Sequence, residues 1–203
     1  VAMSQSGSAV VTWQKHDGLA ISIWSSRYEM GLGWSQAEKL ETDDTYPAYL
    51  PKIDVDSAGN ASVVWEQYDS VSAKYSTWGA HYNLATGWST ATVISNVDNQ
   101  SAYDAQIAVS DNGRAVAVWE QFDGTRFNVW TNVAQNGVWG NAERVEYNTT
   151  GANEYYLPQV AIDQTGTAMV VWQQFDGNQL SAWSNRLLNG TWEVAQRIEA
   201  NDI

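Results

Sequence analysis

The hydrophobic pattern is clearest near the end of the chain, where short apolar runs are separated by turn residues. In residues 168–174, Ala168 and Trp172 lie on one face of an extended segment, while Met169 and Val171 lie on the other. A strand that is apolar on both faces needs a covering layer on each side. The pattern therefore predicts an interior strand at these residues, which we name strand B.

Three more strands are predicted around strand B, each set off by a turn signal. Gln-Thr-Gly, Asp176-Gly177 and Asn189-Gly190 supply residues that tolerate the positive φ of tight turns. No long segment shows the apolar spacing and capping residues of a helix. We therefore expect a four-stranded antiparallel meander, with strand A at residues 158–163, strand C at 180–187 and strand D at 192–199.

The same unit recurs four times, and its tryptophans mark the recurrence. All 12 tryptophans fall at three positions of a period of about 53 residues. The first set ends a Gly-x-Ala-x-x-x-Trp motif and comprises Trp13, Trp65, Trp119 and Trp172. The second set comprises Trp24, Trp78, Trp130 and Trp183, and the third comprises Trp34, Trp88, Trp139 and Trp192.

Four-stranded sheets set around an axis cover both faces of every repeat, so the sequence predicts an all-β fold, a β-propeller of four blades. The repeats are expected at residues 1–50, 51–104, 105–157 and 158–203 of one domain. A β-solenoid is an alternative, although its turns take fewer residues, and a sandwich seldom repeats one motif so faithfully. The pattern leaves open whether blades one and four pack together or whether the repeats are an excerpt of a larger ring.

The motif Gly-x-Ala-x-Val-Val-Trp-Glu/Gln-Gln-x-Asp-Gly, as in residues 166–177, resembles the Trp-rich repeats of uncharacterised secreted bacterial proteins. The resemblance covers the whole chain and implies an extracytoplasmic repeat protein with no known activity. The motif is also similar, in part, to the Asp-box of sialidases, Ser-x-Asp-x-Gly-x-x-Trp. Here Gly166 precedes Trp172 by six residues rather than three, so sialidase chemistry does not carry over.

Composition and charge narrow the choice of partners. The net charge of −13, from 23 acidic and 10 basic residues, repels nucleic-acid phosphates and anionic lipid. The absence of cysteine excludes disulfides and thiol ligands. No apolar run is long enough to span a membrane, and the start of the sequence lacks the charged and apolar pattern expected of a signal peptide, although a leader removed earlier is compatible with this. We expect a secreted, cell-surface or periplasmic protein with no cofactor and no membrane insertion.

One end of the predicted meander gathers the BC turns and the D-to-A linkers, which carry aromatic and polar side chains. Flat apolar rings edged by hydrogen-bonding groups suit sugars and peptides. We therefore predict a glycan or protein partner on this face. The candidate ligand-binding residues are Tyr49, Tyr103, Tyr156, Trp34, Trp88, Trp139, Trp192, Glu66 and Glu120.

Several of these positions also have a structural interpretation. The first two tryptophan sets are expected in the core between blades, and the linker tyrosines favour packing as well. Asp54 and Asp56 resemble the start of a calcium loop, but the other repeats lack the first acid, so no metal site is predicted. The four aspartates of the BC turns are expected to form hairpins. They are Asp17, Asp69, Asp123 and Asp176.

A catalytic alternative depends on Glu66 and Glu120, which can form a carboxylate pair across adjacent blades, as glycoside cleavage requires. Gln14 and Gln173 hold the same position in the other blades, which favours a structural hydrogen-bonding role. No nucleophile elbow, P-loop or zinc-protease motif is present. We therefore expect a binding module with no catalytic residues rather than an enzyme. The alternatives are a polysaccharide glycosidase or lyase and a structural assembly subunit.

Overall fold

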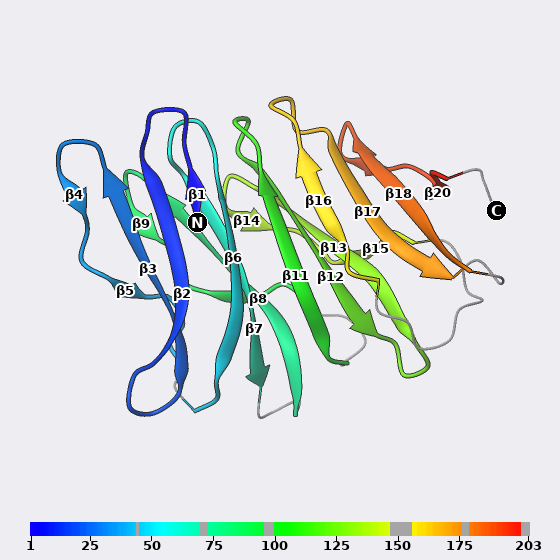
Figure 1. Ribbon diagram of the computed structural model, residues 1–203, viewed down its shortest axis with the longest axis horizontal. Coiled ribbons are helices and arrows are strands. Elements are labelled where there is room, and N and C mark those ends of the chain that lie inside the picture. Colours follow the sequence, from blue (N-terminus) through cyan, green and yellow to red (C-terminus); the bar gives the residue numbers. More distant parts are fainter. Residues whose placement is uncertain (44, 70–72, 96–99, 147–155, 176–178, 200–203) are drawn as a thin grey trace.

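The computed structural model confirms the all-β fold of four antiparallel blades, each built from one repeat (Figure 1). It describes residues 1–43, 45–69, 73–95, 100–146, 156–175 and 179–199. Every regular element within these ranges is a β-strand. Blade 1 holds β1 to β5, blade 2 holds β6 to β10, blade 3 holds β11 to β15, and blade 4 holds β16 to β20.

Each blade is a meander in which strands A, B and C pair in chain order and strand D pairs with C. Strand A is β1 (Ala2–Met3), β6 (Ala48–Val55), β11 (Ala102–Val109) and β16 (Gln159–Ile162). Strand B is β2 (Ala9–His16), β7 (Ala61–Asp69), β12 (Arg114–Phe122) and β17 (Ala168–Phe175). Strand C is β3 (Ile21–Glu29), β8 (Lys74–Asn83), β13 (Phe127–Gln135) and β18 (Leu180–Leu188).

Strand D differs from the prediction, because in every blade it is two short pieces rather than one strand. In blade 4 the pairing with strand C slips by one residue between Trp192 and Arg197, so a bulge interrupts the strand expected at residues 192–199. The pieces are β4 (Gly33–Trp34) and β5 (Glu38–Lys39), β9 (Gly87–Trp88) and β10 (Thr92–Val93), β14 (Val138–Trp139) and β15 (Glu143–Arg144), and β19 (Thr191–Trp192) and β20 (Gln196–Arg197).

The core lies between successive blades, and three tryptophans of the first set are at its centre. Trp65 and Trp119 are fully buried, and Trp172 is nearly so. Each indole Nε1 donates a hydrogen bond of 2.9 to 3.0 Å to a glutamine two residues later. Burying the ring therefore leaves no unpaired donor. These three tryptophans occupy the inter-blade core that the sequence predicts, whereas Trp13 of blade 1 is only half-buried.

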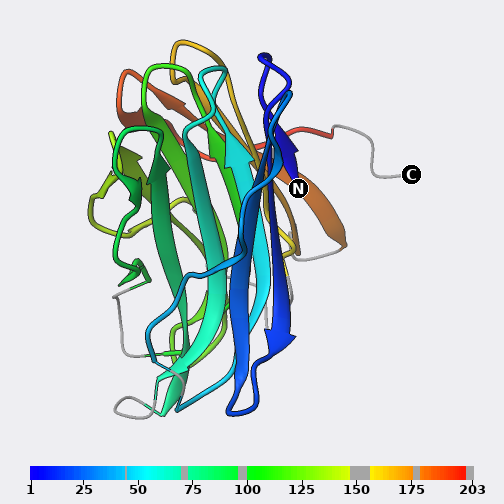
Figure 2. The same ribbon diagram turned by 90° about the vertical axis from the view of Figure 1, so that its left-hand side faces the viewer.

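The four blades stand side by side with blades 1 and 4 at opposite ends of the longest axis (Figure 1). Seen from the blade 1 end, the blue strands of blade 1 lie at the right, and the other blades extend to their left and behind them (Figure 2). The BC hairpins of blades 1 and 3 turn at the same end of the strands, toward the bottom of Figure 1. Because strand ends from neighbouring blades meet there, side chains that are far apart in the sequence come together.

Candidate functional site

Strand A carries a bulge at the end where the BC turns lie. In β6 the pairing with β7 shifts by one residue between Tyr49 and Lys52, and in β11 it shifts between Tyr103 and Gln106. Both strands therefore begin before the repeat boundaries expected at 51 and 105. The residue after each linker tyrosine takes a positive φ, a conformation that costs energy for any residue with a side chain. These residues are Leu50 (φ 53°), Asp104 (φ 55°) and Leu157 (φ 44°).

A hydrogen bond from the preceding blade holds each bulge. The Asp104 amide donates to Glu66 Oε1 at 2.7 Å, and the Leu157 amide donates to Glu120 Oε1. In blade 2 the Leu50 amide donates to Gln14 Oε1 at 3.0 Å. In blades 1 to 3 the residue after the first-set tryptophan thus ties its blade to the next one. Glu66 and Glu120 have this structural role in common with Gln14, as the sequence comparison of the repeats predicts.

Three carboxyl groups come together at this point, and we call Glu66, Asp104 and Glu120 the acidic rim. Burial raises the pKa of Glu66 to about 6, and the neighbouring Asp104 charge adds to that shift. Burial likewise raises the pKa of Glu120 to about 7, with smaller contributions from the charges of Asp104 and Glu66. The amides that each glutamate accepts, and Lys52 near Glu66, act in the opposite direction. Near neutral pH the rim therefore holds both protonated and ionised carboxyl groups.

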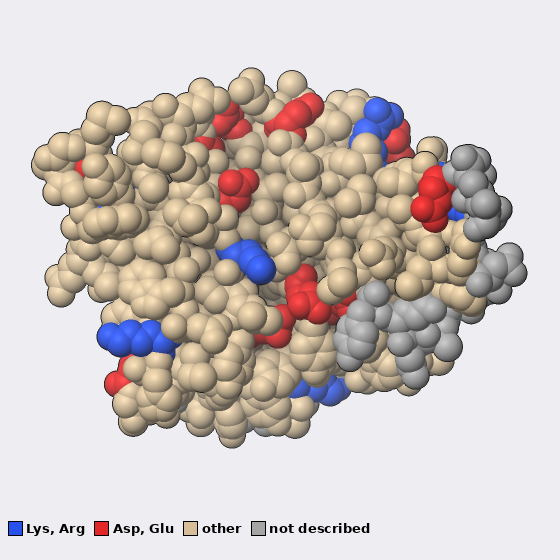
Figure 3. All heavy atoms as spheres, in the orientation of Figure 1, with Lys and Arg blue, Asp and Glu red and all other residues tan. Residues whose placement is uncertain are grey.

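The two glutamates differ in access to solvent. Glu120 is 0% exposed, and its Oε2 is buried without a hydrogen-bond partner. Glu66 is 6% exposed. Asp104, on the bulge between them, is half-buried. On the face formed by β6 and β11, acidic side chains gather near the middle beside a basic one (Figure 3). Asp104 is thus the most exposed of the three carboxyl groups, and Glu120 is the least exposed.

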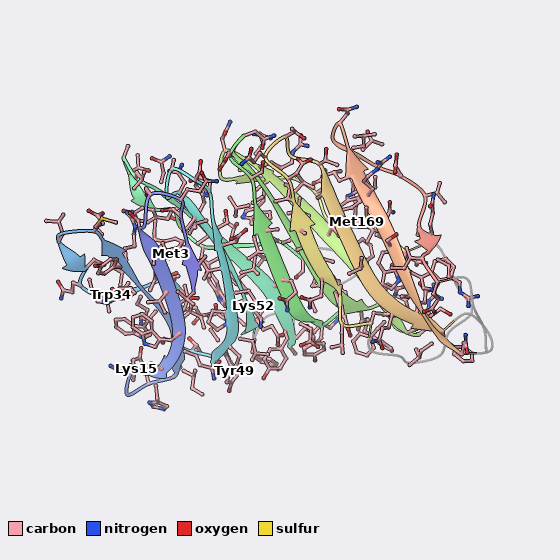
Figure 4. The ribbon with its side chains drawn as sticks, turned by 45° about the horizontal axis from the view of Figure 1, so that its top comes forward. Met3, Lys15, Trp34, Tyr49, Lys52 and Met169 are labelled. Carbon is pink, nitrogen blue, oxygen red and sulfur yellow. The ribbon has the colours of Figure 1, made fainter. Side chains whose placement is uncertain are left out.

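A row of aromatic rings runs beside the acidic rim across blades 2 and 3. Neighbouring ring centroids along it lie 5.1 to 6.2 Å apart, in tilted or edge-on contact. All of its rings are half-buried, so part of each faces solvent. Tyr49, which Figure 4 places at the end of β6, joins the row through Tyr75. This aromatic row consists of Tyr46, Tyr68, Tyr75, Tyr103, Phe127 and Phe122.

The structure brings together only part of the predicted ligand-binding set. Tyr49, Tyr103, Glu66 and Glu120 lie at the acidic rim or beside it, whereas Tyr156 is almost fully buried in the core between blades 3 and 4. In the third tryptophan set, Trp34 is exposed, and the other three pack against inter-blade clusters. These three are Trp88, Trp139 and Trp192.

Tyr68, Tyr75 and Asp104 are not among the ligand-binding residues that the sequence predicts. Tyr68 and Tyr75 face each other across the start of the BC hairpin, as Phe122 and Phe127 do in blade 3. The sequence does contain a signal for Tyr68, because an aromatic residue also lies three positions after the first-set tryptophan in blade 3. No sequence pattern indicates the positive φ that brings Asp104 to the rim. This conformation belongs to a bulge, and a bulge depends on the pairing between strands.

The remaining polar candidates have structural partners. Asp17 Oδ1 accepts the amides of Leu19 and Ala20, which hold the pKa of Asp17 well below its usual range. Asp123 forms the equivalent turn in blade 3, while Asp176 lies outside the described residues. The Asp17 and Asp123 contacts fit hairpin formation rather than catalysis.

The two acids of the calcium-like segment point to different partners. Asp54 Oδ2 accepts the Val109 amide at 2.7 Å in the next blade, whereas Asp56 Oδ1 accepts the amides of Gly59 and Asn60 in its own turn. Within the described ranges no cluster of three or more acidic, histidine or cysteine side chains has the geometry to hold a metal ion.

No protein-family model matches the chain, and no curated protein matches it. Solved structures do share the fold. A protein of unknown function from Dyadobacter fermentans superposes with a TM-score of 0.64 at 11% identity, over 97% of this chain and 67% of its own. An ulvan lyase from a new polysaccharide lyase family gives 0.60 at 9%, over 90% and 51%. The α-L-arabinanase of Penicillium chrysogenum, solved with arabinobiose, gives 0.58 at 14%, over 96% and 64%.

The chain thus spans about half to two thirds of the length of these similar proteins. Enzymes that cleave polysaccharides have this fold, which corrects the expectation that the chain is not an enzyme. That expectation came from the absence of a known catalytic motif, and such motifs do not define this fold. No described segment forms a helix long and apolar enough to cross a membrane.

Proposed function

We propose that the chain is an extracytoplasmic enzyme that hydrolyses glycosidic bonds of a neutral polysaccharide at the acidic rim. The observation that carries this proposal is the meeting of Glu66, Asp104 and Glu120 at one rim, with two of the three pKa values raised toward neutrality. Glycoside hydrolysis uses one protonated and one ionised carboxyl group, separated in pKa by their surroundings. The shared fold of the ulvan lyase and the arabinanase supports a polysaccharide substrate.

The charge of the molecule favours a neutral substrate over a uronate-containing one. The net charge is −13, and among the charged groups that act on Glu66 only Lys52 is basic. A polysaccharide with a carboxylate on every residue would approach against this field. For the same reason hydrolysis is favoured over the lyase reaction, which acts on uronates.

The positions of the carboxyl groups assign a role to each. Glu66 has a raised pKa and is less buried than Glu120, so it donates the proton to the glycosidic oxygen. Asp104 supplies the second carboxyl group, either as nucleophile or as the base that activates water. Glu120 is too deeply buried to touch the sugar and acts through its charge on its neighbours. Tyr103 and Tyr75 of the aromatic row contact the apolar faces of the sugar rings.

Release of reducing ends from a panel of neutral polysaccharides tests the proposal. Glu66→Gln and Asp104→Asn are each expected to lower the rate by about 100-fold or more, because proton transfer and charge stabilisation each contribute at that level. Both variants should keep the fold. Glutamine already serves at the equivalent blade 1 position, where Gln14 accepts the Leu50 amide, and Asp104 holds Glu66 through its backbone.

Glu120→Gln is the matched control, since it makes the same exchange at the same repeat position one blade later. It is expected to leave the maximal rate within about 10-fold while shifting the pH profile, because it removes a nearby charge and no reacting group. Failure to cleave any neutral polysaccharide, or a rate unaffected by Glu66→Gln and Asp104→Asn, would refute the proposal.

A further inference from the structure

The three junctions between blades are built alike. At the junction of blades 1 and 2, Ile23 and Leu40 of blade 1 pack against Trp65, Trp78 and Trp88 of blade 2. We call the side that a blade turns toward the next blade its aliphatic face, and the side that it turns toward the preceding blade its tryptophan face. At the next junction Val64 and Ile94 meet Trp119, Trp130 and Trp139. At the last junction Val118, Val129 and Val145 meet Trp172, Trp183 and Trp192.

Within the part of the chain that the structure describes, no blade covers the aliphatic face of blade 4. Met169 is 41% exposed and Ile198 is 58% exposed, whereas the residues at the same repeat positions in blade 1, Val10 and Leu40, are 2% and 6% exposed. Strand β17 alternates between buried and exposed residues along its length, while β7 and β12 are buried on both faces. This side of blade 4 therefore exposes apolar side chains of strands B and D to water.

The opposite end of the molecule presents the complementary surface. Trp34 on the tryptophan face of blade 1 is 58% exposed, and Trp13 and Trp24 are only half-buried. Figure 4 shows Trp34 at the outer end of the molecule, on the opposite side from Met169. The tryptophans at equivalent positions in blades 2 to 4 all pack into inter-blade clusters.

A polar contact at the junction of blades 1 and 2 also has counterpart residues on the two open faces. Arg27 of blade 1 lies 4.1 Å over the Tyr82 ring of blade 2 and donates to its hydroxyl. The residues at these repeat positions on the two open faces are Arg186 in blade 4 and Tyr28 in blade 1. Arg186 is half-exposed and pairs with Glu193 on the surface, so it can reach a tyrosine docked beside it.

We propose that a second copy of this chain docks head to tail, with the tryptophan face of its blade 1 on the aliphatic face of blade 4. A second copy fits because each open face carries residues at the same repeat positions as the faces that pack together at the three junctions within the chain. Different surfaces meet in such a contact, so repetition gives a closed ring or an open filament. The inference is independent of the proposed catalytic activity.

Sedimentation velocity over a wide range of protein concentration tests the proposal. The wild-type chain is expected to shift from monomer to larger species as concentration rises. Met169→Glu blocks the aliphatic face and Trp34→Glu blocks the tryptophan face, so each variant alone should stay monomeric. Because both side chains are exposed, neither change should unfold the chain. Val138→Glu, at an exposed residue off both faces, is the control and should associate like the wild type.

Mixing the two blocked variants gives the most specific result. The Met169→Glu variant keeps an intact tryptophan face, and the Trp34→Glu variant keeps an intact aliphatic face. The mixture should therefore form a one-to-one dimer that grows no further. A wild-type chain that stays monomeric at every concentration overturns the proposal. So does a mixture in which both variants remain monomeric, or association that neither variant weakens.

Discussion

At the scale of single residues, the tryptophans separate into buried scaffold and exposed surface. Trp119 is fully buried, and its indole donates to Gln121 at 2.9 Å, whereas Trp34 is largely exposed. Trp119→Ala is expected to lower the free energy of unfolding by about 3 to 5 kcal/mol through lost burial and a residual cavity. Trp34→Ala should cost less than about 1 kcal/mol. Urea denaturation of the two variants measures the contrast, and equal losses would contradict it.

Glu120 makes stability depend on pH in an unusual direction. Its pKa rises from 4.5 to about 7 on folding because the carboxyl is buried, so the folded chain keeps a proton that the unfolded chain releases. Stability is therefore highest below the unfolded pKa and falls as pH rises through this interval, by an amount on the order of 2 kcal/mol from this group. Above the folded pKa the loss is complete.

Glu120→Gln is expected to flatten this dependence. Thermal unfolding at about pH 5 and about pH 8 measures it, and the variant should show a smaller drop in Tm between the two. Glu66 and Glu146 also have raised pKa values, so part of the fall in stability with pH should remain in the variant. A variant with the full wild-type drop would show that Glu120 is not the source.

At the scale of elements, the sequence predicts strands B and C well because their apolar pattern and flanking turns are local. Strand B of blade 4 was expected at 168–174 and is observed at Ala168–Phe175. The local apolar pattern does not predict the interruption of strand D between Trp192 and Gln196. It arises from a register shift against strand C, and residues within strand D do not encode that shift alone.

The turns between strands A and B also connect neighbouring blades. The Asn112 side-chain amide of blade 3 donates to Thr165 O of blade 4 at 2.7 Å, and a Cβ on Gly166 would lie 2.4 Å from that nitrogen. Gly166→Ala should therefore lose this contact in addition to the strain of a positive φ. Gly18→Ala is the control, since its φ is also positive but no atom lies within 4 Å of the new methyl group. In chemical denaturation we expect Gly166→Ala to be less stable than Gly18→Ala by about 1 kcal/mol, and equal stability would contradict the role of the turn.

At the scale of the whole molecule, the repeats predicted the blades and the end of the strands where the candidate site lies. They also paired Glu66 with Glu120, because the period sets these residues at equivalent positions. They did not predict that Asp104 lies between them, since that depends on a bulge in one blade held by a carboxylate of another. The depth at which Tyr156 and Glu120 are buried also depends on packing between blades, which the sequence of one repeat does not specify.

The decisive measurement for catalysis at the acidic rim is the crystal structure of the Glu66→Gln variant with a neutral oligosaccharide that the wild-type chain cleaves. We expect a sugar over the acidic rim, with a glycosidic oxygen within hydrogen-bonding reach of residue 66, the carboxyl group of Asp104 beside the same bond, and a sugar ring against Tyr103. A sugar bound at Trp34 or elsewhere, with the carboxyl groups of the rim untouched, would contradict it.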